Sequence, residues 1–254
     1  MSTITVVIPS HNDAAMLAAC LRAVARQTRP PDEVLVVDNA STDATPDVCR
    51  AAGVRRIYEP EVGVASATFR GFDEARGEWL ARLDADSVPP PHWLARLEAD
   101  LLAAGEDTAV TGPGEFYGSG PVIRWIAQTL YIGGYRWSMT LLLGHPPLFG
   151  SNFGLHRSMW NRLRGRVHRG NPRVHDDLDL CYQLRPGMRV RWDRDLRVGV
   201  SARPFGTWRG LGRRLAMAYA TLRVDFEQEP PCRRRRDRLR GFRRRNRKGA
   251  AGRA

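Results

Sequence analysis

Short apolar runs alternate with helix-like patterns over the first half of the chain. The apolar runs that predict strands are residues 4–8, 33–37, 54–58, 79–83 and 108–111. Between them, apolar residues recur every three or four positions, as on one face of an amphipathic helix. The stretches with this spacing are residues 14–27, 42–52, 64–75 and 93–102. Strands that alternate with helices are typical of βαβ units, so we expect an α/β fold with a mostly parallel sheet flanked by helices.

The second half of the chain is less regular. Residues 122–143 are rich in aromatic and aliphatic side chains, and Gly133-Gly134 is expected to divide them into two amphipathic helices. A strand is predicted over 152–156 and a helix over 177–184. Residues 208–226 have apolar positions at helical spacing with arginines between them, which predicts a further amphipathic helix. Packing in the core is the ordinary interpretation of these apolar residues, and membrane contact is the alternative.

The positive charge of the chain is concentrated at its C-terminus. The whole sequence of 254 residues has a net charge of +13, and residues 232–254 contain eleven arginines and one lysine against one aspartate. Such a block is expected to be disordered or transiently helical. An anionic membrane surface is the preferred partner because it requires only charge. Solubility comes next, and nucleic acid is disfavoured because Phe242 is the one aromatic platform in this block.

Several signals bear on where the protein resides. The apolar and charged fractions, 43% and 26%, are those of a soluble globular protein. No uncharged apolar run reaches the roughly 18 residues of a membrane-spanning helix. The first nine residues lack the basic region of a signal peptide, and the four dispersed cysteines are expected to be reduced. We therefore expect a cytoplasmic protein, peripheral at the inner face of the cell membrane.

Polar clusters follow three of the predicted strands, at residues 9–13, 38–43 and 84–86. Ligands of open α/β sheets bind outside the carboxyl ends of the strands, so the three clusters predict one site. Asp84 and Asp86, separated by one small residue, can reach a hard divalent cation that keeps positions open for phosphate oxygens. The alternative is an acidic turn at a helix N-terminus. Asp38 can accept a hydrogen bond from a base or a ribose, while Ser41 or Thr42 caps the next helix.

A second acidic cluster, His175-Asp-Asp-Leu-Asp-Leu180, lies at a predicted helix start. Neighbouring carboxylates raise the pKa of one member, which suits a general base. The alternative is a structural acidic first turn, above all for Asp179, and His175 is either a ligand, a proton carrier or structural. The sequence contains no G-x-S-x-G, Walker A or G-x-G-x-x-G motif, which excludes P-loop nucleotide hydrolysis and ordinary dinucleotide oxidoreduction.

In this order, the motifs resemble those of family 2 glycosyltransferases with the GT-A fold. The matching segments are Val6–Asp13, Val36–Asp43, Gly77–Asp86, His175–Leu180 and the small-residue loop Gly150–Gly154. The resemblance covers roughly residues 2–205 and implies a Rossmann-like, mostly parallel sheet with a mixed acceptor-side half. It implies residues 1–112 for the nucleotide sugar and 113–205 for the acceptor within the same domain. The residue pattern adds a helical, basic C-terminal extension, with an amphipathic helix over 206–231 and a disordered arginine-rich tail over 232–254.

The resemblance also implies roles for individual residues. Asp86, together with Asp84, would hold Mg²⁺ or Mn²⁺ on the diphosphate of the donor. Asp177 would be the catalytic base, and Asp176 stands beside it where the family has glutamate. The residues implied in nucleotide-sugar binding are Pro9, Ser10, Asn12, Asp13, Asp38, Arg70 and Asp84. Arg70 is included as a displaced cation, because Thr68 and Phe69 stand where the family often has arginine and asparagine.

The expected reaction is metal-assisted transfer of one sugar, with inversion, from a nucleoside diphosphate sugar to an acceptor hydroxyl. A lipid-linked acceptor or a cell-envelope glycan is the expected acceptor class. Single transfer is expected because the Gln-x-x-Arg-Trp signature of processive synthases is absent. One alternative is transfer to a polyprenyl phosphate, which needs no base and is disfavoured by the acidic pair. The other is an inactive nucleotide-sugar-binding protein, which the changes at Thr68 and Phe69 favour.

Overall fold

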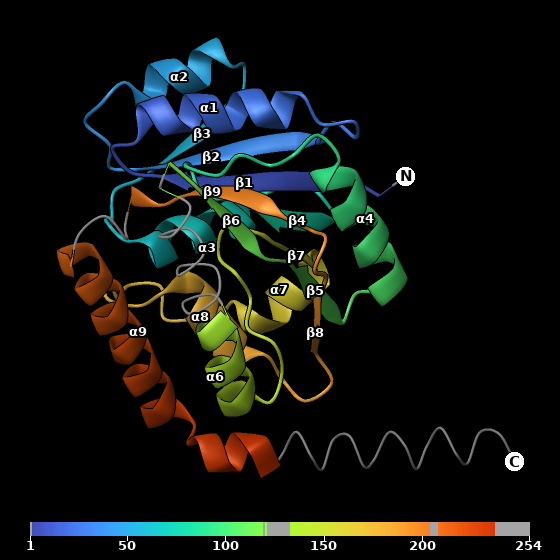
Figure 1. Ribbon diagram of the computed structural model, residues 1–254, viewed down its shortest axis with the longest axis vertical. Helices are drawn as coiled ribbons and strands as arrows, with labels where there is room; N and C mark the ends of the chain where they lie inside the picture. The colour runs from blue at the N-terminus through green and yellow to red at the C-terminus, as the bar shows by residue number, and fades with distance from the viewer. Residues whose placement is uncertain (1, 119, 121–132, 204–207, 237–254) are drawn as a thin grey trace, which may run out of the picture.

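The computed structural model describes residues 2–118, 120, 133–203 and 208–236. Its centre is a seven-stranded sheet in the order β3-β2-β1-β4-β7-β5-β8, in which β7 is antiparallel to both of its neighbours (Figure 1). The strands of this sheet are β1 (Ile4–Ser10), β2 (Glu33–Asn39), β3 (Arg55–Glu59), β4 (Trp79–Arg82), β5 (Thr108–Thr111), β7 (Phe153–His156) and β8 (Arg189–Trp192). A separate parallel pair consists of β6 (Gly114–Tyr117) and β9 (Val198–Ser201).

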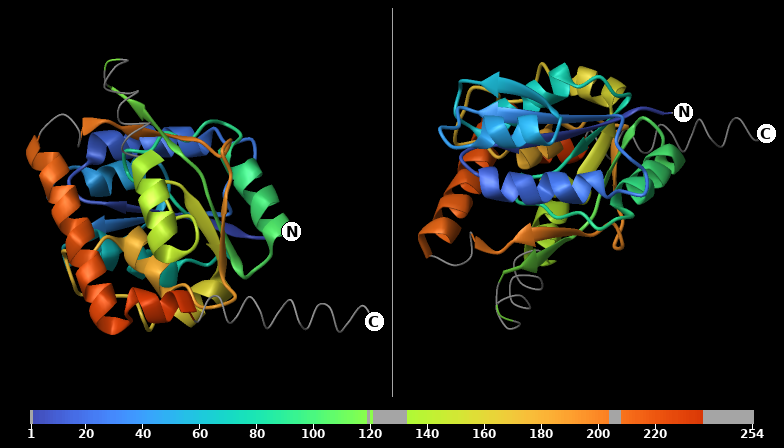
Figure 2. Two further views of the ribbon diagram at one scale, coloured as in Figure 1. Left: turned by 60° about the horizontal axis from the view of Figure 1, so that its bottom comes forward. Right: turned by 90° about the horizontal axis from the view of Figure 1, so that it is seen from above.

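Helices cover both faces of the sheet (Figures 1 and 2). The helices on one face are α1 (Ala14–Ala25), α2 (Thr45–Ala51) and α4 (Trp93–Ala104). Those on the other are α3 (Val64–Glu74), α7 (Arg157–Leu163) and α8 (Asp176–Gln183). Two further helices, α6 (Gly133–Leu143) and α9 (Trp208–Gln228), lie farther from the sheet than α8 does. The structure therefore has the layered α/β architecture that the sequence predicts.

The central strands are apolar along their whole length because both faces of the sheet are buried. On β1, Ile4, Val6 and Ile8 belong to the core under α1 and α4, whereas Val7 belongs to the core under α3. Helix α3 approaches the sheet closely at Gly71, where a Cβ atom would lie 2.3 Å from Cγ1 of Val7. The contact explains why this position is a glycine and fixes the height of α3 above the sheet.

The predicted strands are confirmed to within two residues at each end. The helix predicted over 42–52 begins only at Thr45, and the expected capping by Ser41 or Thr42 is wrong. Both residues instead bond to Asn12: the Asn12 N–H donates to Oγ of Ser41 and the Thr42 N–H donates to Oδ1 of Asn12. In the second half, β7, α8 and α9 are confirmed. Of the two helices expected in 122–143, α6 is confirmed, while residues 121–132 lie outside the described part.

The C-terminal segment is structured further than expected. Residues 231–236 are helical, and Arg234 is 4% exposed. Its guanidinium lies 4.5 Å from the centre of the Tyr182 ring and donates to the carbonyl of Cys181 at 3.0 Å. Residues 232–254 are predicted from the sequence to be disordered or transiently helical, and their first five residues are helical, with one arginine packed in the structure. Residues 237–254 lie outside the described part of the chain.

Two other expectations concern cysteines and membranes. All four cysteines are free thiols, as predicted, and three of them are buried. Among the described helices, none combines the length and the apolar character that crossing a bilayer requires.

Candidate active site

Three neighbouring strands bring the predicted polar clusters to one edge of the sheet. Strand β1 lies between β2 and β4, with Ser10 beside Asp38 and Val7 beside Arg82. The strands are parallel, so the loops that follow them, 9–13, 38–43 and 84–86, all emerge at this edge. The prediction that these clusters share one edge is confirmed.

Arg82, the last residue of β4, joins two of the acidic motifs. Its side chain is buried, with Nη1 at 2.6 Å from Oδ1 of Asp84 and Nη2 at 2.9 Å from Oδ2 of Asp176. Nη1 also donates to the carbonyl of Gly150. Burial alone would lower the pKa of the guanidinium, but the surrounding carboxylates, Asp176 first, raise it. Arg82 is therefore a permanent positive charge around which the loops 84–86 and 150–151 and the start of α8 assemble.

Asp84 is held on both of its oxygens. Oδ1 pairs with Arg82, and Oδ2 accepts a hydrogen bond from the hydroxyl of Ser151. The side chain is 35% exposed, so it reaches the surface of the site from a fixed orientation. Direct metal coordination by Asp84 would compete with these two contacts, which makes Asp86 the better-placed ligand of the pair.

The acidic pair at the start of α8 has two different environments. Asp176 is buried, and Oδ2 accepts from the hydroxyl of Thr68 at 2.6 Å as well as from Arg82. Asp177 is half-buried, and Oδ2 accepts the N–H of Gly150 at 2.9 Å. Burial and the charge of Asp176 raise the pKa of Asp177. Asp176 is thus fixed by its buried contacts, and Asp177 is the partly exposed member of the pair, with a raised pKa of the kind that suits a general base.

A second arginine joins the ends of β1 and β4. The guanidinium of Arg203, which follows β9, donates to both oxygens of Asp13 at 3.0 and 2.6 Å. Its Nη2 also lies 3.7 Å from Oδ2 of Asp86. The hydrogen bonds to Asp13 raise the pKa of Arg203. Two carboxylates from different loops therefore face one cationic group, and oxygen donors of this kind suit Mg²⁺ or Mn²⁺.

The loops after β1 and β2 are bound to each other. Asn12 and Ala40 both have positive φ, 51° and 52°, which costs energy for residues other than glycine and is common at functional sites. Asp38 is only 1% exposed, and its oxygens accept from the N–H of Ser41 and from Arg56. In this structure Asp38 orders its own loop. Ser10 differs, because its buried Oγ has no hydrogen-bond partner among the described residues.

The remaining predicted residues lie in the same region or on its margin. Pro9 is buried in β1 beside Val37. Arg70 lies on α3 with its guanidinium paired to Glu74 one turn further on, at 3.2 Å. The structure does not bring Arg70 into contact with the carboxylates of the loops, so its expected role as a replacement cation has no support in these contacts.

Sequence reasoning missed several members of the site. These are Thr68, Arg82 and Arg203, with Gly150 and Ser151 noted only as part of a small-residue loop. An arginine inside the apolar run 79–83 was the one signal for a buried ion pair. Nothing in the sequence ties Arg203 to Asp13, because they are 190 positions apart.

Two groups of histidine and aspartate among the described residues have ligand atoms within 4.8 Å of one another: His175, Asp176 and Asp177, and His168, Asp179 and Asp225. Neither group contains Asp84 or Asp86. In the first group, Arg82 already compensates Asp176.

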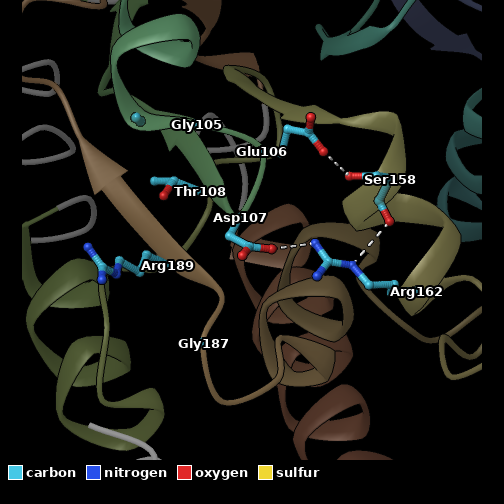
Figure 3. Close-up of a pocket in the computed structure, with 9 residues that line it drawn as sticks. Gly105, Glu106, Asp107, Thr108, Ser158, Arg162, Gly187 and Arg189 are labelled. Atoms are coloured by element: carbon cyan, nitrogen blue, oxygen red, sulfur yellow. Dashed lines mark hydrogen bonds and ion pairs between the residues drawn. The ribbon is translucent and has the colours of Figure 1, made fainter. Parts of the chain in front are cut away.

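A surface pocket lies at the opposite edge of the sheet, around the start of β5 (Figure 3). It is lined by the turn at Gly105 and by Arg162, which pairs with Asp107. None of the predicted site residues lines it, so the pocket is unrelated to the acidic motifs.

The chain is similar in sequence to known glycosyltransferases. The sequence model described as "Glycosyl transferase family 2" matches residues 5–164. A PGL/p-HBAD biosynthesis glycosyltransferase of Mycobacterium bovis is 42% identical over 88 residues, which are 32% of this chain and 34% of that protein. Glycosyltransferase AglE of Haloferax volcanii is 36% identical over 121 residues, 44% of this chain and 40% of that protein. The matches thus span about a third to two fifths of these relatives.

Two solved structures share the fold. The mannosyltransferase PcManGT of Pyrobaculum calidifontis, in complex with GDP-Man and Mn²⁺, has a TM-score of 0.66 and 23% identity, covering 95% of this chain and 69% of that chain. Glucosyl-3-phosphoglycerate synthase of Mycobacterium tuberculosis, in complex with Mn²⁺, UDP and phosphoglyceric acid, has a TM-score of 0.62 and 22% identity, with coverages of 88% and 78%. At these identities, the likeness establishes the fold alone.

Proposed function

The chain belongs to glycosyl transferase family 2 and has the GT-A fold, and from that premise we propose that it transfers one sugar from a nucleoside diphosphate donor to an acceptor hydroxyl with inversion. The observation that carries the proposal is the convergence of the acidic motifs. Arg82 joins Asp84 to Asp176, and Arg203 joins Asp13 to the neighbourhood of Asp86. This arrangement supports a diphosphate site and a general base that would be adjacent.

The base and ribose of the donor would bind at the ends of β1 and β2, beside Pro9, Ser10, Asn12, Asp13 and Asp38. Ser10 supports this placement most directly, because a buried hydroxyl without a partner is unusual and a ligand would satisfy it. The exchange of hydrogen bonds between Asn12 and the loop 41–42 holds both loops in place before the donor binds.

The diphosphate would bind near Asp86, with Mg²⁺ or Mn²⁺ held by that carboxylate. Such a cation, when bound, offsets the charge that develops on the leaving diphosphate. Asp84 supports this place indirectly, since Arg82 and Ser151 fix the turn on which Asp86 stands. Arg203 keeps the carboxylates of Asp13 and Asp86 facing each other.

Asp177 would act as the base. As the acceptor oxygen attacks the anomeric carbon, the proton of the hydroxyl passes to Asp177 and the bond from the anomeric carbon to the diphosphate oxygen breaks on the opposite side. The N–H of Gly150 holds one carboxylate oxygen of Asp177. Thr68 and Arg82 hold Asp176 beside it, whose negative charge keeps Asp177 basic.

Membrane attachment is a second element of the proposal. Trp137 and Leu141, one turn apart on α6, and Tyr219 on α9 are large apolar side chains with more than half of their surface exposed. The arginine-rich sequence after Arg236 adds charge that an anionic surface attracts. We propose a peripheral position near a lipid-linked acceptor. Flotation with anionic liposomes, lost in high salt and on deletion of residues 237–254, tests it; binding that survives both would contradict it.

The test of the reaction is release of nucleoside diphosphate from a panel of sugar donors with Mn²⁺. UDP-glucose and GDP-mannose are the first donors to try, because the structural neighbours were solved with UDP or with GDP-Man. We expect one donor to be consumed by the wild type and by the exposed control Asp47→Asn, but not by Asp177→Asn. A phosphate acceptor used equally well by Asp177→Asn would favour the polyprenyl-phosphate alternative. If the wild type binds a donor but consumes none, the alternative of an inactive nucleotide-sugar-binding protein is favoured.

A further inference from the structure

A second polar cluster lies beneath the long helix α9, away from the residues assigned to the donor. It consists of His168, in the loop before α8, Asp179 on α8, and Asp225 on α9, two helices that lie side by side (Figure 1). Both aspartates are 0% exposed, whereas the side chain of His168 is 24% exposed. The proposed sugar transfer uses none of the three.

The cluster has more acceptors than donors. Nδ1 of His168 lies 3.0 Å from Oδ1 of Asp179 and 3.7 Å from Oδ1 of Asp225. Nε2 of Gln183 has three acceptors within 3.2 Å, namely Asp179, Asp225 and Gln228, although an amide nitrogen carries two protons. Oδ2 of Asp225 is buried and has no hydrogen-bond partner among the described residues. A buried carboxylate oxygen in this condition needs either a proton or a metal cation.

The hydrogen bond to Asp179 raises the pKa of His168, but no cationic side chain among the described residues donates to Oδ2 of Asp225. The guanidinium of Arg234 is close enough to lower the pKa of Asp225 electrostatically, but its Nη2 donates to the carbonyl of Cys181 and lies 3.3 Å from Nε2 of His145. Burial and the charge of Asp179 prevail, and they raise the pKa of Asp225 to about 9. Without a bound cation, the Asp225 carboxyl therefore keeps its proton at neutral pH, beside the pair that Asp179 forms with His168.

We propose that His168, Asp179 and Asp225 bind a divalent cation of the borderline class, Zn²⁺ first, as a structural site separate from the catalytic cation. One imidazole nitrogen and two carboxylates form a donor set that zinc accepts. In tetrahedral zinc sites, ligand atoms about 2.0 Å from the metal are about 3.3 Å apart, and the two His168 distances of 3.0 and 3.7 Å bracket that separation. The amide of Gln183, whose nitrogen lies 3.2 and 3.1 Å from the two carboxylates, would have to turn over to offer its oxygen as a fourth ligand.

The site would join α9 to α8 and to the loop 164–175. Helix α8 begins with Asp176 and Asp177, and the N–H of His175 is bound to Thr221 of α9. A cation at this place would therefore fix the helix that carries the proposed base, without touching the donor.

Zinc uptake by the full chain, made without a histidine tag, tests the proposal. The background variant Cys232→Ser removes the exposed thiol, which would otherwise bind zinc. After treatment with EDTA and desalting, we expect this protein to take up one equivalent of Zn²⁺ by elemental analysis and to melt at higher temperature. His168→Gln and Asp225→Asn should lose both effects. His92→Gln, which changes an exposed histidine, should keep them.

Two outcomes would overturn the proposal. In one, the wild type and His168→Gln take up the same amount of zinc and melt at the same temperature. The cluster would then bind no zinc, and a proton shared between Asp179 and Asp225 would explain their contact. In the other, Asp86→Asn abolishes the uptake, which places the zinc at the catalytic site. Because His168 is partly exposed, its variant is the informative one if Asp225→Asn fails to fold. Nucleotide binding, which tests the proposed function, is measured separately.

Discussion

Nη2 of Arg82 lies 2.9 Å from Oδ2 of Asp176, so the end of β4 and the start of α8 are joined by a buried ion pair. The two residues belong to motifs that are far apart in the sequence. Arg82 also holds Asp84, and Asp176 stands next to the proposed base. The pair therefore holds the loop 84–86 and the start of α8 at a fixed distance from each other.

Removing the arginine should unfold this arrangement. Arg82→Met leaves Asp84 and Asp176 without their counter-charge, and breaking a buried pair in this way costs about 3–5 kcal/mol. Urea denaturation should report that loss in the free energy of unfolding. Arg50→Met, which removes an arginine from an exposed pair with Asp47, should change it by no more than about 0.5 kcal/mol. Equal effects of the two substitutions on the free energy of unfolding would show that the buried ion pairs of Arg82 do not stabilise the fold.

The proposed base gives a kinetic prediction. Asp177→Asn should lower kcat by about 10²- to 10⁴-fold while nucleotide affinity stays unchanged, because the asparagine cannot take a proton. Steady-state kinetics and calorimetry with the nucleotide measure the two quantities. Turnover at the rate of the wild type would remove Asp177 from this role.

The same carboxylate should set the acid limb of the pH profile. Burial and the charge of Asp176 raise the pKa of Asp177. The ionised form is the active one, so kcat/KM should fall as the pH falls through this raised pKa, above the range of an ordinary aspartate. In Asp176→Asn the neighbouring charge is gone, and the limb should move to lower pH. If the acid limb of Asp176→Asn lies at the same pH as that of the wild type, a group other than Asp177 is responsible for it.

Gly150 should tolerate no side chain. An added Cβ would lie 2.9 Å from Oδ2 of Asp177 and 3.3 Å from Nη1 of Arg82. Gly150→Ala should displace the base by a fraction of an ångström and reduce kcat by about 10²-fold. Gly165→Ala is the matched control, because nothing lies within 4 Å of its Cβ. Full activity of both variants would show that a side chain at position 150 does not displace Asp177.

Arg203 should oppose binding of the cation alone. Its guanidinium lies 3.7 Å from Asp86 and is bound to Asp13. At such a distance, charge repulsion amounts to roughly 1 kcal/mol even in water, so Arg203→Gln should tighten Mn²⁺ binding about fivefold in the absence of nucleotide. Arg197→Gln, which removes an exposed partner of Glu115, should leave it unchanged. Weaker binding of Mn²⁺ to Arg203→Gln would place the cation elsewhere.

The fold could be predicted well because its strands are apolar on both faces and end in polar loops. The place of Asp84 and Asp86 followed from that pattern. The partners of the acidic residues did not, since Thr68 and Asp176 are 108 positions apart and meet only when α3 packs beside α8. In the sequence, Thr68 counted as a departure from the family pattern. In the structure, its hydroxyl donates a hydrogen bond to Asp176, so this threonine helps to hold the buried carboxylate.

The central claim is that the acidic loops form one metal-dependent site for a nucleoside diphosphate, and calorimetry of UDP and GDP binding tests it most directly. The wild type should bind one of the two nucleotides in the presence of Mn²⁺ and lose most of that affinity with EDTA. Asp86→Asn should bind it weakly with or without the metal. Binding of neither nucleotide to the folded wild type, or equal binding to Asp86→Asn, would contradict the account.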